Sequence, residues 1–275
     1  MVNQQRVALV GTGVMGGALL EALVGAARPG REVVVVDAAP GRAQEVARAH
    51  GVAHAESIGQ AAAGADVVLL AVKPGDVAGA LAELAPVAGP GTLVVSVAAG
   101  LPTAWYEERL PAGVPVVRVM PNTPATVGRG VSAISAGAAA REAHLDLAEE
   151  LLRPTGVVVR VAEKDQDAVT AISGSGPAYV FYVIDALAEA GVLLGLPRAL
   201  ATTLAVETVH GSGALASGSG VHPAVLRERV SSPGGTTVAA LRRLDAAGVR
   251  AAIVDAAVAA HDRSVELGRA LAADG

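Results

Sequence analysis

The 275-residue chain contains no cysteine, which excludes disulfide bonds, thiolate nucleophiles and thiolate metal ligands. Aromatic side chains make up only 2% of the residues, and the whole set is Trp105, Tyr106, Tyr179, Phe181 and Tyr182. Hydrophobic residues nevertheless reach 52%, so the core must be built from small aliphatic side chains. That much apolar surface excludes intrinsic disorder, because its burial offsets the entropy lost on ordering. The length allows one large domain or two smaller ones.

Lysine is scarce as well, with Lys73 and Lys164 as the only two in the chain. The net charge is −5 and no run of Lys and Arg is present, so we expect no nucleic-acid partner, because phosphate neutralisation requires clustered cations. No strongly apolar run of about 18–20 residues occurs, so we expect no membrane-spanning helix. The N-terminus lacks the pattern of a signal peptide, and we expect a cytoplasmic protein. The six histidines lack metal-ligand spacing, so we expect no metal site.

Two different patterns divide the chain near residue 162. Before it, short β-branched runs alternate with alanine-rich segments, which predicts a parallel sheet covered by helices on both faces. The expected strands are 7–10, 33–36, 67–72, 93–97, 116–119, 131–135 and 157–161, and the expected helices are 18–27, 42–50, 76–84 and 141–152. After it, helical stretches are expected at 167–171, 178–194, 198–215, 224–230, 237–245 and 249–267. We therefore expect an α/β domain over 1–162 and an all-α domain over 163–275.

The helical part has few large side chains. It would gain stability by burying its apolar faces against a second copy of the chain, so we expect a homo-oligomer, with a compact monomeric bundle as the alternative. The segment 212–220 is the only low-complexity stretch, and its serines and glycines predict a flexible loop.

A glycine-rich turn follows the first expected strand and opens a helix, the context that the dinucleotide-binding fingerprint requires. Its residues are Gly11, Thr12, Gly13, Val14, Met15 and Gly16. Gly11 permits the tight turn, Gly13 lets the backbone approach the pyrophosphate, and Gly16 lets the helix pack on the strand. The helix N-terminus then faces the phosphates. The motif predicts a Rossmann-type dinucleotide-binding domain; an unspecialised glycine-rich turn is the alternative.

Asp37 ends the second expected strand, where this fold places the residue that reads the adenosine ribose. A carboxylate there accepts hydrogen bonds from ribose hydroxyls and repels a 2′-phosphate, which favours NADH. Arg42 could instead pair with that phosphate, and Asp37 could instead cap the next helix. The residues alone therefore leave the choice between NADP(H) and NAD(H) open.

Further cofactor contacts are expected where later strands end, because ligands bind at the carboxyl edge of such sheets. The candidates are Ala71, Val72 and Lys73 after one strand and Val97, Ala98 and Ala99 after the next. Asn122 lies in a stiff segment between two prolines and is expected to face the nicotinamide end, with an ordinary rigid turn as the alternative.

Two Ser- and Gly-rich segments, 173–179 and 231–237, each precede an expected helix. The second offers hydroxyls, closely spaced backbone N–H groups and a helix N-terminus, a combination that suits a carboxylate ligand. Ordinary helix N-caps are the alternative interpretation of both segments.

Together these segments resemble those of Δ1-pyrroline-5-carboxylate reductases. The resemblance rests on GTGVMG at 11–16, AVKP at 71–74, SVAAG at 96–100, RVMPNTPA at 118–125, DAVTAISGSGPAY at 167–179 and VSSPGGTT at 230–237. It implies NAD(P)H-dependent reduction of 1-pyrroline-5-carboxylate to L-proline, the last step of proline biosynthesis. It also implies a helical C-terminal dimerisation domain, with homodimers that assemble into larger rings such as a decamer. The family commonly prefers NADPH, a preference that Asp37 puts in doubt for this chain.

The resemblance also implies roles for the segment 231–237. Thr237 would be the catalytic residue, with its hydroxyl near the imine nitrogen. Ser232 and the backbone N–H groups of Gly234, Gly235 and Thr236 would hold the substrate carboxylate. Imine reduction needs no strong side-chain base, so positioning and electrostatics would carry most of the rate.

Other functions remain as alternatives. β-Hydroxyacid dehydrogenases share the glycine-rich start and a helical C-terminal domain, but they use a lysine on the long helix after the domain boundary, and this chain has none after Lys164. A different imine-reducing oxidoreductase is a second alternative. A dinucleotide-sensing regulator without turnover is a third, and the second anion-binding segment argues against it.

Overall fold

A computed structural model describes residues 5–25 and 31–273, so the last two residues of the helix expected at 18–27 lie outside the described residues. The chain forms two compact units. The first comprises residues 1–174 and 260–275, and the second comprises 175–259. This division differs from the boundary expected near residue 162 because segment 163–174 packs against the sheet and the last helix returns to it.

The first unit is built on a sheet whose eight described strands run in the order β3-β2-β1-β4-β5-β6-β7-β8. The strands are β1 (Gln5–Val10), β2 (Arg31–Val36), β3 (Ala53–His54), β4 (Val67–Leu70), β5 (Leu93–Ser96), β6 (Val116–Met120), β7 (Gly130–Ala136) and β8 (Gly156–Arg160). All neighbouring pairs are parallel except β6 and β7. The strand order reverses between β1 and β4, which is the point where doubly wound sheets bind ligands.

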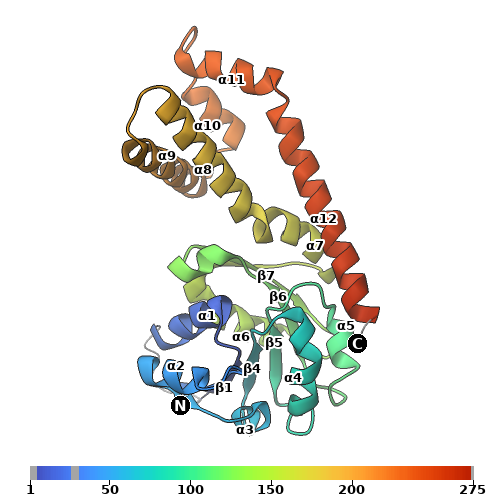
Figure 1. Ribbon diagram of the computed structural model, residues 1–275. Helices are drawn as coiled ribbons and strands as arrows, with labels where there is room; N and C mark the ends of the chain where they lie inside the picture. Colours follow the sequence, from blue (N-terminus) through green and yellow to red (C-terminus); the bar gives the residue numbers. More distant parts are fainter. Residues whose placement is uncertain (1–4, 26–30, 274–275) are drawn as a thin grey trace. The chain divides into compact units, whose positions relative to one another are not determined.

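Helices cover both faces of this sheet, as the sequence predicted (Figure 1). They are α1 (Val14–Gly25), α2 (Arg42–His50), α3 (Ile58–Ala62), α4 (Val77–Leu84), α5 (Thr103–Glu107) and α6 (Glu142–Leu152). Side chains of α1, α2 and α6 form one core with one face of the strands, and side chains of α3, α4 and α5 form a second core with the other. Short 3₁₀ turns complete the layers: η1 (Pro74–Asp76), η2 (Thr123–Val127), η3 (Arg153–Thr155) and η4 (Glu163–Asp165).

One helical run begins beside the sheet and continues into the second unit. It consists of η4, α7 (Gln166–Val169), the π-helical turn η5 (Thr170–Gly174) and α8 (Gly176–Leu193). By length and composition this run, 163–193, would suffice to cross a membrane, although the sequence predicted no spanning helix. In the most apolar 18-residue stretch of this run, only 6% of the residues are buried within the chain. The run therefore presents an extended apolar surface.

The second unit is entirely helical in its described residues. Besides α8 it contains α9 (Arg198–Ser219), α10 (Pro223–Arg229), α11 (Thr236–Ala246) and the first part of α12 (Val249–Ala273). The flexible loop predicted at 212–220 is wrong, because α9 continues to Ser219 and ends only at Gly220, whose φ is +63°. Each interior glycine costs about 1 kcal/mol against alanine, and a helix this long tolerates that cost.

The end of α12 belongs to the first unit. Ser264 donates a hydrogen bond of 2.6 Å to Asp167 of α7. Gly268 lies against Gly100, so that a Cβ at residue 268 would come within 2.8 Å of the Gly100 carbonyl oxygen. Leu271 packs against the core that includes α5. These contacts attach the final turns of the chain to the sheet layer.

Candidate functional site

A cavity of about 640 Å³ opens at the carboxyl ends of β1, β2 and β4. Of the residues predicted to bind the cofactor, it is lined by Gly11, Gly13, Asp37, Ala71, Val72 and Lys73. Its wall also contains residues that the sequence did not single out, among them Glu56, Ser57, Ile58, Asp76, Gly79, Ala80 and Glu83. These come from the segment before α3 and its first residue, from η1 and from α4. The cavity size and position suit a dinucleotide.

The three fingerprint glycines differ in what surrounds them. Gly11 has a φ of +89° and donates to the carbonyl of Val36 at 2.8 Å. A Cβ at Gly16 would overlap the Gly11 carbonyl oxygen, so both residues serve the fold itself. Gly13 has no atom within 4 Å of the place where a Cβ would lie. The space beside Gly13, just before α1, is therefore open, and its predicted role in admitting a pyrophosphate stays a prediction.

Asp37 joins the end of β2 to the glycine turn. One carboxylate oxygen accepts hydrogen bonds from the backbone N–H and the hydroxyl of Thr12, both at 2.7 Å, and the other accepts from the backbone N–H of Ala39 at 2.9 Å. Partial burial raises the pKa of Asp37, but hydrogen bonds from Ala39 and Thr12, helped by the charge of Arg42, outweigh it and lower the pKa below its usual value. Asp37 is therefore a fixed anion beside the cavity.

The segment after β5 lies partly in the core. Val97 donates to the carbonyl of Leu70 at 3.0 Å, and Ala98 is buried among apolar side chains. Neither residue lines the cavity described above, nor does Ala99, although all three follow the strand next to β4. Their part in cofactor binding stays a prediction.

Asn122 is buried, and both the oxygen and the nitrogen of its side-chain amide hydrogen-bond to backbone groups. Its oxygen accepts from the backbone N–H of Val131 at 2.8 Å, and its nitrogen donates to the carbonyl of Ser173 at 3.1 Å. It therefore fastens the π-helical turn η5 to the start of β7. Asn122 was predicted to face the nicotinamide, and that role stays a prediction beside this structural one.

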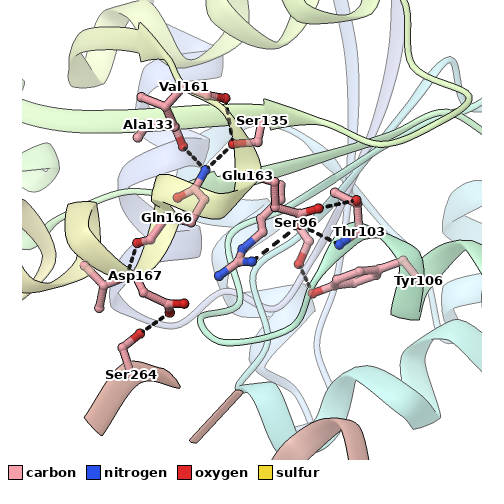
Figure 2. A network of polar contacts seen from close by, with 12 residues as sticks. Ser96, Thr103, Tyr106, Ala133, Ser135, Val161, Glu163, Gln166, Asp167 and Ser264 are labelled. Carbon is pink, nitrogen blue, oxygen red and sulfur yellow. Dashed lines mark hydrogen bonds and ion pairs between the residues drawn. The ribbon is translucent and has the colours of Figure 1, made fainter. Parts of the chain in front are cut away.

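A polar network holds the segment 163–167 to the sheet (Figure 2). Glu163 accepts from the backbone N–H and the hydroxyl of Thr103, at 2.6 and 2.7 Å, and pairs with the buried Arg118 at 3.4 Å. Gln166 donates to Ser135 of β7 at 2.7 Å. Single-sequence patterns gave no signal for these contacts, because each joins residues more than 30 positions apart.

The predicted substrate segment forms the turn between α10 and α11 in the second unit. Gly235 donates to the carbonyl of Ser232 at 3.0 Å, and a Cβ at Gly235 would meet the Ser232 hydroxyl oxygen at 2.5 Å. Gly234 has a φ of +71°. Helix α11 begins at Thr236, and its first N–H groups have no acceptor one turn earlier in the helix. The turn contains Ser232, Gly234, Gly235, Thr236 and Thr237, and their roles toward a substrate stay predictions.

Comparison with known proteins gives concordant results for the two parts of the chain. Residues 163–267 match the family model "Pyrroline-5-carboxylate reductase dimerisation", and residues 6–100 match "NADP oxidoreductase coenzyme F420-dependent". A pyrroline-5-carboxylate reductase of Corynebacterium melassecola is 45% identical over 271 residues, which cover 96% of this chain and 98% of the relative.

Solved structures agree with these sequence matches. A pyrroline-5-carboxylate reductase from Coxiella burnetii is 33% identical, with a TM-score of 0.91 over 96% of this chain and 99% of that one. The Plasmodium falciparum pyrroline carboxylate reductase, solved with NADP bound, is 28% identical, with a TM-score of 0.84 over 98% of this chain and 100% of that one.

Proposed function

The chain belongs to the pyrroline-5-carboxylate reductase family, and on that premise we propose how its own residues reduce 1-pyrroline-5-carboxylate to L-proline with NAD(P)H. The observation that carries the proposal is the presence, in one chain, of a dinucleotide cavity behind the glycine turn and of the Ser- and Gly-rich turn at 231–237. The first binds the reductant and the second binds the carboxylate of the cyclic imine.

The cofactor is held chiefly through backbone. The open approach at Gly13 and the N-terminus of α1 receive the pyrophosphate, while Gly11 and Gly16 keep strand and helix close together. Asp37 reads the adenosine ribose. Ala71, Val72 and Lys73 form the wall that follows β4, and in this proposal Val97, Ala98, Ala99 and Asn122 contact the coenzyme nearer its nicotinamide end. When bound, the reduced nicotinamide supplies the hydride that adds to the imine carbon.

The substrate is held by the turn between α10 and α11. Backbone N–H groups of Gly234, Gly235 and Thr236, together with the Ser232 hydroxyl, bind the carboxylate, favoured by the partial positive charge of the helix N-terminus. The hydroxyl of Thr237 hydrogen-bonds the ring nitrogen and orients the C=N bond. The imine arrives protonated, so the nitrogen keeps its proton while the carbon gains the hydride, and no side-chain base is needed.

Quaternary structure and location follow from the same premise. Residues 163–267 constitute a dimerisation region, and the exposed apolar surface of α8 fits that role. We propose that this surface is covered by a second copy of the chain rather than by lipid, and that dimers assemble into a decamer. We also propose a cytoplasmic enzyme without a nucleic-acid partner.

One experiment separates this function from its alternatives. Oxidation of NADH and of NADPH is followed spectrophotometrically with the pyrroline substrate and, in parallel, with a panel of 3-hydroxy acids run in the oxidative direction with NAD⁺ and NADP⁺. We expect turnover with the cyclic imine alone. Turnover of the hydroxy acids would favour a β-hydroxyacid dehydrogenase, and tight coenzyme binding without turnover would favour a sensor. The absence of any lysine after Lys164 supports the imine, because alcohol oxidation needs a proton acceptor.

A further inference from the structure

The charges around the coenzyme cavity are strongly unequal. Of its lining residues, Asp37, Glu56, Asp76 and Glu83 carry carboxylates, and Lys73 carries the only ammonium or guanidinium group. A 2′-phosphate on the adenosine ribose adds a charge of about −1.5 to −2 next to the end of β2. The wall therefore opposes the phosphorylated coenzyme unless a nearby cation compensates.

The hydrogen bonds of Asp37 favour a ribose hydroxyl over a 2′-phosphate as its ligand. A carboxylate has about four acceptor positions, and three of those on Asp37 are taken by Thr12 and Ala39. The remaining position suits one ribose hydroxyl donor. A phosphate has no proton to give there and meets a carboxylate that its neighbours keep ionised.

Arg42 is the cation placed to compensate, but it is engaged elsewhere. Its guanidinium donates to the carbonyl of Thr12 at 3.4 Å and pairs with Glu45, one turn further along α2, at 3.3 Å. Arg42 makes no ion pair with Asp37 among the described residues. Glu45 therefore offsets the charge of the guanidinium beside the end of β2, where a 2′-phosphate would lie.

We propose that the Arg42–Glu45 ion pair shifts the coenzyme preference of this enzyme further toward NADH. Glu45 is a positioning residue in this scheme: it lies outside the cavity lining and acts through Arg42. The proposal rests on the proposed function, since it assumes that the cavity takes a nicotinamide dinucleotide.

The test measures binding rather than turnover. Dissociation constants of NADH and NADPH are obtained by isothermal titration calorimetry at low salt, for the wild type and for Glu45→Gln, Arg42→Gln and the double variant. We expect the wild type to bind NADH more tightly. Glu45→Gln should tighten NADPH binding by at least about twofold, the scale of an exposed ion pair, and leave NADH nearly unchanged. Arg42→Gln should weaken NADPH selectively and abolish the effect of Glu45→Gln in the double variant.

Glu266→Gln is the matched control, because it frees Arg263 from another exposed pair three residues apart, on α12. It should change neither constant, and circular dichroism verifies that every variant is folded. Tighter binding of NADPH by the wild type, or an unchanged NADPH-to-NADH ratio in Glu45→Gln, would overturn the proposal while leaving the reductase function intact. Failure of both coenzymes to bind would instead overturn the proposed function itself.

Discussion

At the scale of single residues, some glycines of the turn at 11–16 are required by the fold and another is open to a ligand. Gly11 and Gly16 are constrained by their own neighbours, whereas Gly13 faces open space. A side chain at residue 13 therefore fits the free protein and obstructs only the coenzyme.

We expect Gly13→Val to keep the wild-type melting temperature within a few degrees and to weaken coenzyme binding by at least about tenfold, because its side chain fills the pyrophosphate approach. Gly16→Ala is the matched comparison and should lower stability by about 1–3 kcal/mol, since its Cβ overlaps the turn. Thermal melts and coenzyme titrations measure both effects. Normal titration of Gly13→Val would contradict the assignment of the pyrophosphate site.

Thr237 gives a second residue-scale prediction. We expect Thr237→Ala to lower imine turnover by about 10- to 100-fold, the loss of one hydrogen bond to a charged group, with the Kd for coenzyme unchanged. Thr237→Ser retains the hydroxyl and should recover most of the rate. Steady-state kinetics beside coenzyme titration provide the readout. Equal rates for the alanine and wild-type enzymes would remove Thr237 from the mechanism.

At the scale of elements, the contact between β5 and α5 makes the fold sensitive to alkali. Tyr106 of α5 is fully buried and hydrogen-bonds Ser96 of β5 at 2.7 Å. Burial raises the pKa of Tyr106 to about 12, against an ordinary value of 10.0, although the Ser96 hydroxyl and the charge of Arg118 act in the opposite direction. The folded state therefore favours the neutral phenol.

The stability that comes from this shift is complete below pH 10 and is lost as the pH rises to about 12, by about 1.4 kcal/mol per pH unit. Tyr106→Phe cannot ionise, so its free energy of unfolding should fall less over that interval. At neutral pH it should be about 1 kcal/mol less stable, because Ser96 loses its partner. Urea unfolding of both proteins at neutral pH and at about pH 11 tests this. If the free energy of unfolding fell equally in the wild type and in Tyr106→Phe, Tyr106 would not titrate as described.

Elements with a strong local pattern were predictable from the sequence. Continuous apolar runs such as 33–36 and 67–72 were predicted as strands, and most of their residues lie in the parallel strands Arg31–Val36 and Val67–Leu70, because both faces of the sheet are covered. Short elements without such a pattern, β3, α3 and α5, were missed, since tertiary contacts rather than local periodicity hold them. The end of α9 was mistaken for a loop because its glycines and serines resemble a breaker.

The residues of the candidate site also fall into those that local sequence indicates and those that it does not. Glycines and helix starts can be seen directly in the sequence, so Gly11, Gly13 and the turn at 231–237 could be selected as candidate sites, and their binding roles stay predictions. Roles that depend on a residue far away in the sequence could not be predicted. Nothing local in the sequence indicates that Glu163 accepts from Thr103, or that both ends of the Asn122 amide bind backbone.

At the scale of the whole molecule, the second unit alone buries few of its apolar side chains. Among residues of α8 and α9, only Ala188, Ala201 and Ala205 are buried, while Phe181 and Leu193 are 61% and 89% exposed. An exposed apolar surface of this extent marks a site of interaction with another protein or with a membrane. The match of 163–267 to a dimerisation model supports the proposal that a second copy of the chain covers this surface.

We expect Leu187→Glu, at a half-exposed position of α8, to weaken self-association and to lower the melting temperature, because a carboxylate is costly to bury in an apolar interface. Val87→Glu makes a similar exchange at a similarly exposed site outside 163–267. It should change neither self-association nor the melting temperature. Light scattering coupled to size-exclusion chromatography, over a range of concentrations, measures the mass. An unchanged oligomer for Leu187→Glu would place the interface elsewhere.

The return of α12 to the sheet layer affects how the protein is made. The first unit is discontinuous, and the pieces that complete it, Ser264, Gly268 and Leu271, follow the whole second unit along the chain. A nascent chain therefore completes the first unit only after α12 has been synthesised. A stop codon ahead of Ser264 would damage a unit that is otherwise encoded before residue 175.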